Sequence, residues 1–289
     1  MKPYIEFKKQ RDLGEILSDT FAFIRNEFRP FFNAFLKIVG PYLAVMLISY
    51  GFYMYKVGDV FNFSLEIPET GANGWVILLV ALAFATSLIA TYALATATTL
   101  FYIKSYAANN GIIEFEAVKK QSYGALWQFI GLFILVGLCV GIGFMFCIVP
   151  GVYLYVPLSL AFAILVFNQK SVSEAFGYSF TLVKDYWWNT FACLFVVGII
   201  VMVASYAFAL PAQIYSLVKV GIWSGEVDAE SITFVDPVSI LLGIISTLAQ
   251  FFMNIISVVA SVFIYFDLNE KKNFTGTYER IKNLGGSTD

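Results

Sequence analysis

The chain has 289 residues and a formal net charge of −2; 59% of its residues are hydrophobic and only 13% are charged. Soluble proteins carry about 25% charged residues, and a chain of this length cannot bury so much apolar surface in one core, so the composition predicts a membrane protein. It excludes a disordered chain, a nucleic-acid-binding protein and a secreted scaffold held by disulfides.

The first 30 residues predict an amphipathic helix on the cytoplasmic side rather than a cleavable signal peptide, because they are charged and lack a short apolar core. Asp12 followed by Glu15 is typical of a helix N-terminus. Apolar or small residues then recur at helical spacing. We expect this apolar face, which includes Phe21 and Phe28, to lie at the membrane interface.

Six apolar stretches between residues 31 and 266 are candidates for membrane-spanning helices, because each lacks the charged side chains that are costly at the centre of a bilayer. A spanning helix needs about 20 residues. The uncharged stretch 121–169 is long enough for two spans, and we place their turn at Pro150-Gly151. The predicted spans are about 31–55, 75–103, 126–149, 151–167, 190–218 and 238–266. Residues 267–289 are then a cytoplasmic tail.

The segment before the fifth span repeats the pattern of the N-terminal segment. Ser171 and Glu174 predict a capping box there, and the apolar stripe that follows includes Phe180 and Trp187, which we also expect at the interface. A weaker helical pattern over 113–124 precedes the third span. The sequence therefore predicts an all-α bundle of three units, each an amphipathic cytoplasmic helix followed by a transmembrane hairpin. Such repeats often surround a functional axis, but duplication alone also produces them.

The basic residues indicate which side of the membrane each segment faces. Of the 18 Lys and Arg residues, all except Lys56 and Lys219 fall in segments that share a side with the N-terminus. The loops on the other side, 56–74 and 219–237, carry Asp and Glu instead. Because cytoplasmic loops are enriched in Lys and Arg, we expect both termini in the cytoplasm.

The sequence offers little catalytic chemistry. It has no His, which is the commonest general base and metal ligand, and the predicted spans contain no Asp, Glu or Arg away from their ends. The common hydrolase, nucleotide-binding and metalloprotease motifs do not occur. Cys139, Cys147 and Cys193 lie within spans, where we expect them to pack rather than to bind a metal. We therefore expect no catalytic residue, no metal site and no cofactor.

Neutral polar residues within the spans allow two interpretations. They can hydrogen-bond neighbouring helices, or they can line a pathway for a neutral or zwitterionic solute. The candidates for such a lining are Thr91, Gln213, Gln250 and Asn254. Gly137 and Gly141 form a Gly-x-x-x-Gly motif in the third span, which predicts close packing of that helix on a neighbour because small residues let backbones approach.

Two stretches of the sequence resemble a known family. The first is LGEILSDTF at residues 13–21, and the second is VPGVYL at 149–154, followed by SEAFGYSFTLVK at 173–184. Together they resemble the membrane domain attached to some bacterial glycerophosphoryl diester phosphodiesterases, over residues of about 11–266. The resemblance implies a six-span protein of the bacterial inner membrane. The phosphodiesterase chemistry of those relatives lies in a separate soluble domain whose histidines this chain lacks, so no catalytic residue carries over.

The sequence leaves two functions open. The first is a non-catalytic scaffold or subunit of a membrane complex, whose partners are the lipid bilayer and other membrane proteins but no nucleic acid. The second is a carrier or accessory protein for lipid or another amphipathic solute. A carrier predicts a polar cleft that reaches the middle of the bilayer, whereas a scaffold predicts a dry bundle or an exposed patch that fits another protein. A membrane enzyme is disfavoured because acid–base groups are missing.

Overall fold

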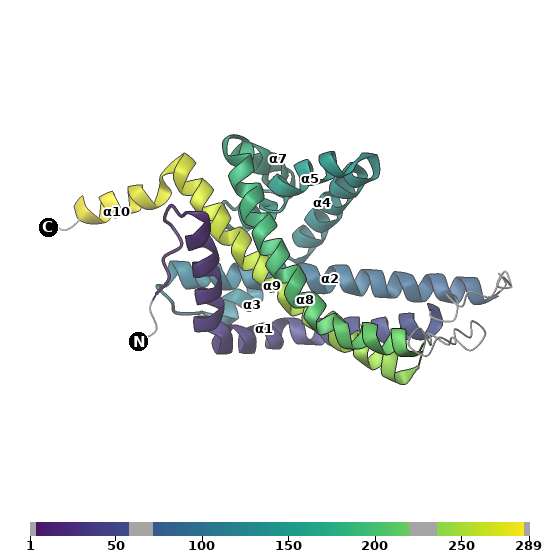
Figure 1. Cartoon of the computed structure of the whole chain (residues 1–289). Coiled ribbons are helices and arrows are strands. Elements are labelled where there is room, and N and C mark those ends of the chain that lie inside the picture. Colours follow the sequence, from purple (N-terminus) through teal and green to yellow (C-terminus); the bar gives the residue numbers. More distant parts are fainter. Residues whose placement is uncertain (1–3, 58–71, 220–235, 286–289) are drawn as a thin grey trace. The chain divides into compact units, whose positions relative to one another are not determined.

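The computed structural model describes residues 4–57, 72–219 and 236–285. Within these residues the chain forms α-helices, one short 3-10 helix (η2) and no strand (Figure 1), which confirms the predicted all-α class. The elements are α1 (Leu13–Val57), α2 (Ala72–Ala108), α3 (Phe115–Gly124), α4 (Leu126–Phe146), α5 (Ile148–Leu158), α6 (Ala161–Phe167), α7 (Val172–Val183), η2 (Lys184–Tyr186), α8 (Trp187–Lys219), α9 (Pro237–Asn273) and α10 (Thr275–Gly285).

Six helical segments are long and apolar enough to cross a membrane, which confirms the predicted number. They belong to α1, to α2, to α4, to α5 with α6, to α7 with α8, and to α9. By the length and composition of its helices, the protein is a multi-pass membrane protein. Four helices greatly exceed the roughly 20 residues that a bilayer requires, since α1 has 45 residues, α2 and α9 have 37 each, and α8 has 33.

The described residues form two compact units. The first unit contains residues 4–38, 93–200 and 255–285, and the second contains residues 39–57, 72–92, 201–219 and 236–254. Helices α1, α2, α8 and α9 contribute to both units, whereas α3 to α7 and α10 belong to the first unit alone.

Aromatic rings from distant parts of the chain form the core of the first unit. Phe7 stacks on Phe263 of α9, with 4.6 Å between the ring centroids, and packs edge-to-face on Phe23 of α1. Tyr106 of α2 packs against both Phe7 and Phe23. All four side chains are buried, and burial of each phenylalanine is worth about 1.5–3 kcal/mol. The segment before α1 is therefore part of the core and not a free tail.

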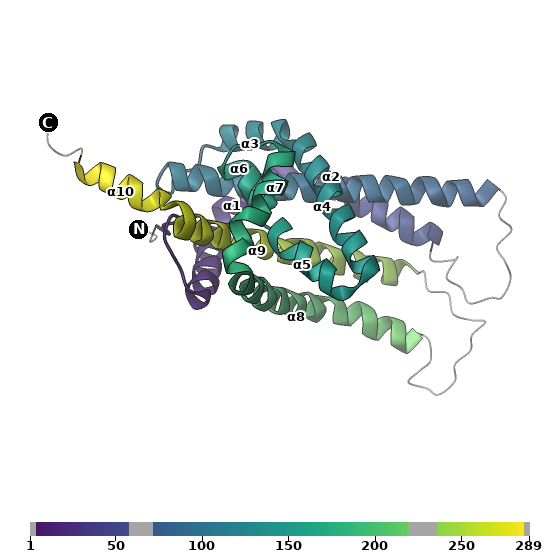
Figure 2. The same cartoon turned by 90° about the horizontal axis from the view of Figure 1, so that it is seen from above.

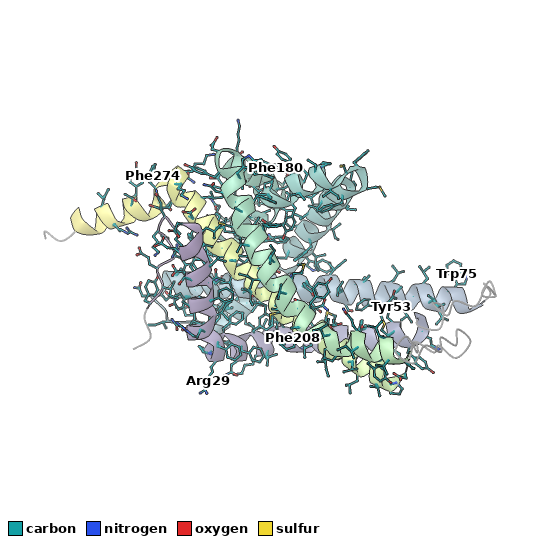
Figure 3. All side chains as sticks on the ribbon, viewed as in Figure 1. Arg29, Tyr53, Trp75, Phe180, Phe208 and Phe274 are labelled. Carbon is teal, nitrogen blue, oxygen red and sulfur yellow. The ribbon has the colours of Figure 1, made fainter. Side chains whose placement is uncertain are left out.

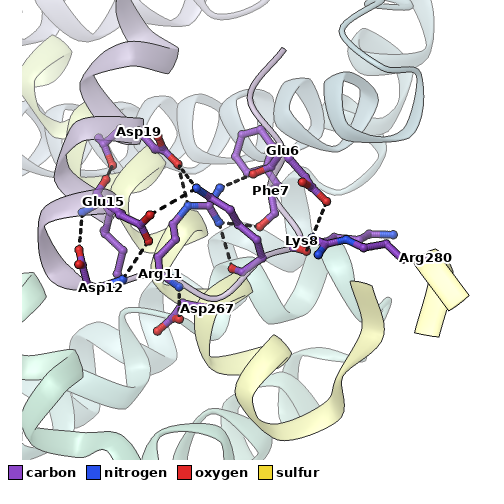
Figure 4. A network of polar contacts seen from close by, with 12 residues as sticks. Glu6, Phe7, Lys8, Arg11, Asp12, Glu15, Asp19, Asp267 and Arg280 are labelled. Atoms are coloured by element: carbon purple, nitrogen blue, oxygen red, sulfur yellow. Dashed lines mark hydrogen bonds and ion pairs between the residues drawn. The ribbon is translucent and has the colours of Figure 1, made fainter. Parts of the chain in front are cut away.

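A buried arginine fastens this N-terminal segment to α9 (Figure 4). The Arg11 side chain is 0% exposed, and its Nε donates to Asp19 Oδ2 at 2.8 Å. Its two terminal nitrogens donate to backbone carbonyl oxygens of the segment before α1, and its guanidinium lies 4.8 Å from the centroid of the Phe263 ring. The backbone N–H of Arg11 donates to Asp267 Oδ1 at 2.8 Å. Such complete pairing offsets the cost of removing a charge from water.

Aromatic contacts also join the helices of the second unit. Tyr53 of α1 stacks on Phe84 of α2 with 5.2 Å between the centroids, and Tyr92 of α2 packs edge-to-face on Phe251 of α9. Offset-stacked and edge-to-face pairs are the favoured geometries for aromatic rings. These contacts therefore help to hold α1, α2 and α9 together within this unit.

Asp236 joins the ends of α8 and α9 in the second unit. Its carboxylate accepts a hydrogen bond from the Ser239 N–H at 2.6 Å, which caps α9. It also accepts from the Tyr215 hydroxyl and from Lys219 Nζ, the latter at 3.0 Å. These hydrogen bonds, that of Tyr215 first, hold the pKa of Asp236 well below its usual range. The carboxylate therefore stays ionised and ties the two helix ends together at neutral pH.

The two predicted helix starts have the same reciprocal hydrogen bonds. Asp12 Oδ1 accepts from the Glu15 N–H at 2.7 Å, and Glu15 Oε2 accepts from the Asp12 N–H at 3.3 Å. At the start of α7, Ser171 Oγ accepts from the Glu174 N–H at 3.4 Å, and Glu174 Oε2 accepts from the Ser171 N–H at 2.9 Å. The structure thus confirms the predicted capping box of α7 and the predicted start of α1.

Each amphipathic segment passes through a bend or break into an apolar helix. Helix α1 bends near Arg29 (Figure 3), next to Pro30, whose ring and missing N–H disturb the regular hydrogen-bond pattern. The 3-10 turn η2 separates α7 from α8, and one residue separates α3 from α4. A residue with positive φ follows each of the returning helices: Asn110 after α2, Gln169 after α6 and Phe274 after α9. The predicted threefold pattern is therefore visible in the secondary structure.

The turn of the middle hairpin lies three residues before its predicted place. Helix α4 ends at Phe146 and α5 begins at Ile148, so Cys147 forms the turn. Pro150 and Gly151, which we expected at the turn, lie in the first turns of α5. Proline is tolerated there because the first backbone N–H groups of a helix have no intrahelical partner.

Two boundaries also differ from the prediction. The amphipathic helix expected over residues 1–30 does not end before the first span, because α1 continues to Val57; Pro30 bends this helix without ending it. The expected tail, residues 267–289, contains the end of α9 and the separate helix α10.

The glycines at which α4 packs closely are not the predicted ones. In the part of the chain that the structure describes, a Cβ added to Gly137 or Gly141 would meet no neighbouring atom within 4 Å. By contrast, a Cβ on Gly143 would lie 3.0 Å from Gly151 Cα. The close contact occurs next to the hairpin turn because α4 and α5 are nearest to each other there. No described helix covers the Gly-x-x-x-Gly motif at this distance.

Candidate functional site

Thr91, the first of the predicted pathway residues, serves as a packing contact. Its side chain is buried, and its hydroxyl donates to the Ser87 carbonyl oxygen at 2.7 Å and lies 3.1 Å from the Tyr42 carbonyl oxygen. Tyr42 belongs to α1 and Thr91 to α2. The hydroxyl therefore joins two helices, which is the commoner role of threonine within membrane helices.

The other three predicted pathway residues are exposed on their helices. Gln213 lies on α8, and Gln250 and Asn254 lie on α9. The Gln250 side-chain amide donates to Ser246 Oγ at 3.2 Å, within the same helix. None of the three lines the cavities described below.

The four predicted interfacial aromatics fall into two pairs. Phe21 and Phe28 of α1 are exposed, with Phe28 stacked on Phe32 at 5.6 Å between centroids. Phe180, labelled at the end of α7 in Figure 3, and Trp187 at the start of α8 are half-buried. The second pair lines the largest cavity described here.

This cavity is a groove of about 1120 Å³ within the first unit. It lies between α5, the C-terminal end of α7, η2 and the start of α8, and Figures 1 and 2 show α5 beside α7. Its volume is slightly above the range of about 300–1,000 Å³ that is typical of sites for small molecules. Because α5 and the start of α8 are both uncharged, the walls of the groove are apolar.

Aromatic side chains form the inner wall of the groove. The Trp187 ring stacks between Tyr153 of α5 and Phe191 of α8, with centroid distances of 5.7 and 5.4 Å. Trp187 Nε1 also donates to the Tyr153 carbonyl oxygen at 3.4 Å. Trp188 is 75% exposed and stands perpendicular to Trp187 at 4.9 Å. Tryptophan rings with one apolar and one polar edge are enriched at the headgroup level of membranes.

The groove is lined by a cation that forms no ion pair within the described part of the chain. Its two charged residues are Lys184 and Asp185, and Asp185 pairs with Lys272 of α9 at 3.2 Å. Lys272 Nζ also donates to the Thr181 carbonyl oxygen at 2.6 Å. Among the described residues, no carboxylate forms an ion pair with the exposed Lys184. This part of the groove therefore has a local excess of positive charge.

Two smaller cavities of the first unit lie beside polar contacts. One, of about 380 Å³, is bounded by Arg11, Cys193 and Asp267. The other, of about 410 Å³, is bounded by Lys104 and Asn168, among others. Lys104 Nζ donates to the Val166 carbonyl oxygen at 3.1 Å. The polar groups named here make hydrogen bonds or ion pairs that hold segments of the chain together.

Several residues of the first unit were not singled out from the sequence. Arg11 and Asp267 lie outside the predicted spans, where charged side chains are usually solvated. Both are nevertheless buried. Glu270 accepts from the backbone N–H groups of Gly276 and Thr277 at 2.7 and 2.9 Å, which caps α10. Two features of the sequence could have indicated these contacts. Asp267 and Glu270 come soon after a long uncharged stretch, and the first residues of the chain mix charged and aromatic types.

The described residues contain no candidate metal centre. No three His, Cys, Asp or Glu side chains within residues 4–57, 72–219 and 236–285 lie close enough together to hold a metal ion. Comparison with family models, curated proteins and solved structures finds no match for this chain. The groove therefore has to be interpreted from its own shape and charge.

Proposed function

We propose that this chain is a non-catalytic protein of the bacterial inner membrane that binds membrane lipid in the groove between α5, η2 and α8. The observation that carries the proposal is the combination of aromatic walls with Lys184, which has no ion-pair partner among the residues that the structure describes. A phospholipid has the matching chemistry, because its acyl chains are apolar and its phosphate is an anion.

The surroundings of the groove favour a lipid over a soluble molecule. The helices of this chain are apolar enough to lie in a bilayer, and an open apolar groove at the surface of such a protein meets acyl chains rather than water. Lys184 can extend its charged end to the headgroup level.

The orientation follows from the charges of the loops. Lys184 belongs to the basic segments that share a side with both termini, and these segments are expected to face the cytoplasm. The headgroup would therefore belong to a lipid of the cytoplasmic leaflet. In this role the protein is an accessory or carrier for lipid, the second of the two functions that the sequence left open.

The test measures how much phospholipid remains bound during purification. In the variant Lys184→Ala we expect about tenfold weaker retention of anionic phospholipid, because one charge-assisted hydrogen bond to phosphate is lost. The matched control is Lys120→Ala, which removes an exposed lysine of α3 outside the groove. Native mass spectrometry of both variants and of the parent protein measures the bound lipid. Equal retention in the two variants would overturn the proposal.

A second function, that of a scaffold or subunit, is favoured by a different observation. Gln213, Gln250 and Asn254 are exposed on otherwise apolar helices, and acyl chains cannot satisfy amide groups. Interhelical hydrogen bonds from another membrane protein can satisfy them. The open face of Gly137 and Gly141 on α4 would let a neighbouring helix approach closely.

A further inference from the structure

The turn between α4 and α5 is unusually short and closed. Cys147 is the only residue between the two helices. Its N–H donates to the Gly143 carbonyl oxygen at 3.1 Å, and its carbonyl oxygen accepts from the Gly151 N–H at 3.4 Å. The two glycines make the turn possible, because a Cβ on Gly151 would lie 2.5 Å from the Phe144 ring. The turn therefore leaves neither backbone group of Cys147 without a partner.

The tip of this hairpin has no polar side chain. From residue 129 to residue 152 the sequence contains no charged residue and no Ser, Thr, Asn or Gln. Met145 and Phe146 are 88% and 83% exposed, and Ile148 and Val149 are almost as exposed. The corresponding segments after α1 and after α8, residues 58–71 and 220–235, each contain several Asp or Glu residues. The middle hairpin thus lacks the composition of a loop that lies in water.

Exposure of this tip to water would be costly. Each of its large apolar side chains loses about 1.5–3 kcal/mol when it is left in water instead of an apolar medium. The backbone is also suited to an apolar medium, because Cys147 is satisfied within the turn and Pro150 has no N–H that needs a partner. Both terms favour acyl chains around the tip.

The returning limb of the hairpin presents only a short surface to lipid. Almost every side chain from Val156 to Val166 is buried inside the first unit, and Ser159 and Leu160 interrupt the helix between α5 and α6. The outward-facing part is then residues 148–155, which rise by about 12 Å at 1.5 Å per residue. The hydrocarbon core of a bilayer is about 30 Å thick, so this surface covers less than half of it.

We propose that α4 and α5 form a re-entrant hairpin, which enters the bilayer from the side of α3 and α7 and turns at Cys147 among the acyl chains. The surface that contacts the acyl chains is formed by Met145, Phe146, Ile148 and Val149. The hairpin leaves the membrane on the side from which it entered, so the termini remain on one side. This inference rests on the turn and its surroundings. It shares Ile148 and Val149 with the lining of the groove, but it does not require that the groove binds lipid.

The charge distribution is equally consistent with this arrangement. A hairpin that crosses twice and a hairpin that turns back both return the chain to the same side. Because no charged residue lies between residues 121 and 169, the basic residues divide between the two sides of the membrane in the same way in both cases. Only a measurement of depth separates the two arrangements.

The experiment measures depth along α4 with spin labels in the full chain. Cys139→Ala and Cys193→Ala leave Cys147 as the labelling site, and Ile134→Cys, Leu138→Cys and Ile142→Cys are each combined with Cys147→Ala. All of these α4 positions are exposed. The labelled protein is reconstituted into phosphatidylcholine vesicles, and collisions with oxygen are compared with collisions with a water-soluble nickel complex.

For a re-entrant hairpin we expect the oxygen-to-nickel ratio to rise along α4 and to be highest at Cys147. A ratio that passes through a maximum near Leu138 and falls at Cys147 would mean that the hairpin crosses the bilayer, and it would overturn the proposal. A low ratio at all four positions would place the hairpin at the membrane surface, which also overturns it. Lys219→Cys, which lies at the end of α8, supplies the value of a site close to water.

Discussion

Buried charges in the first unit act at the level of single residues. Arg11 is removed from water, and its hydrogen bonds go to Asp19 and to backbone carbonyl oxygens of its own segment. Its guanidinium also faces the ring of Phe263. Because removal of the guanidinium would take a hydrogen bond from each of these groups, this residue is more important for stability than its place in a charged N-terminal segment indicates.

We expect Arg11→Met to lower the free energy of unfolding by about 1.5–3 kcal/mol, because the hydrogen bonds of a buried charged group are lost. Arg29→Met is the matched control, since Arg29 is exposed at the bend of α1 and exposed substitutions change stability by about 0.5 kcal/mol or less. Thermal unfolding in detergent, followed by circular dichroism, measures both. Equal shifts of the melting temperature would contradict the structural role of Arg11.

At the scale of elements, the glycines of α4 and α5 differ in what surrounds them. Gly143 and Gly151 lie where the two helices touch, whereas Gly137 and Gly141 face open space within the described structure. The residue type is the same, but the effect of adding a methyl group depends on the neighbouring helix. Sequence spacing alone did not locate the contact at Gly143 and Gly151, because it contains no information on where the helices approach each other.

We expect Gly151→Ala to destabilise the hairpin by about 1–3 kcal/mol, because the added methyl group overlaps the Phe144 ring. Gly141→Ala adds the same group in open space, and it should stabilise the helix by up to about 1 kcal/mol. Chemical unfolding in mixed micelles compares the two variants. The contact is not as described if Gly151→Ala is as stable as the parent protein.

At the scale of the whole molecule, three repeats of similar secondary structure have different surfaces. The second repeat, from α3 to α6, has an apolar tip. The segments at the corresponding places in the first and third repeats contain acidic residues instead. The same pattern of helix, bend and returning helix thus provides two sites for loops and one hairpin suited to lipid. The third repeat also supplies the wall of the groove, through α7, η2 and α8.

The scaffold function predicts a partner that covers the exposed amides of α9. We expect Gln250→Leu combined with Asn254→Leu to reduce the amount of partner protein that co-purifies in mild detergent, because interhelical hydrogen bonds are lost. Ser216→Ala is the control, since its exposed hydroxyl already donates to the Ala212 carbonyl oxygen within α8. Quantitative mass spectrometry compares the purified complexes. An unchanged complex in the double variant argues against this function.

The sequence by itself determined the membrane class, the six apolar helices and the two capped helix starts. These features depend on composition and on residues close together in the chain, such as Ser171 and Glu174, so local rules suffice to predict them. Candidate site residues were predicted less well. Phe180 and Trp187 line the groove, but they were predicted as interfacial residues and not as parts of a cavity.

Only the tertiary structure decided which distant residues meet. The groove requires α5 to lie beside α7 and α8, the Arg11 contacts require the N-terminal segment to reach α9, and the turn requires Gly143 to face Gly151. Each depends on how helices pack, and many packings satisfy the same pattern of apolar residues because hydrophobic burial has no direction. Hydrogen bonds and close contacts do have direction, and they appear only once the helices have been placed.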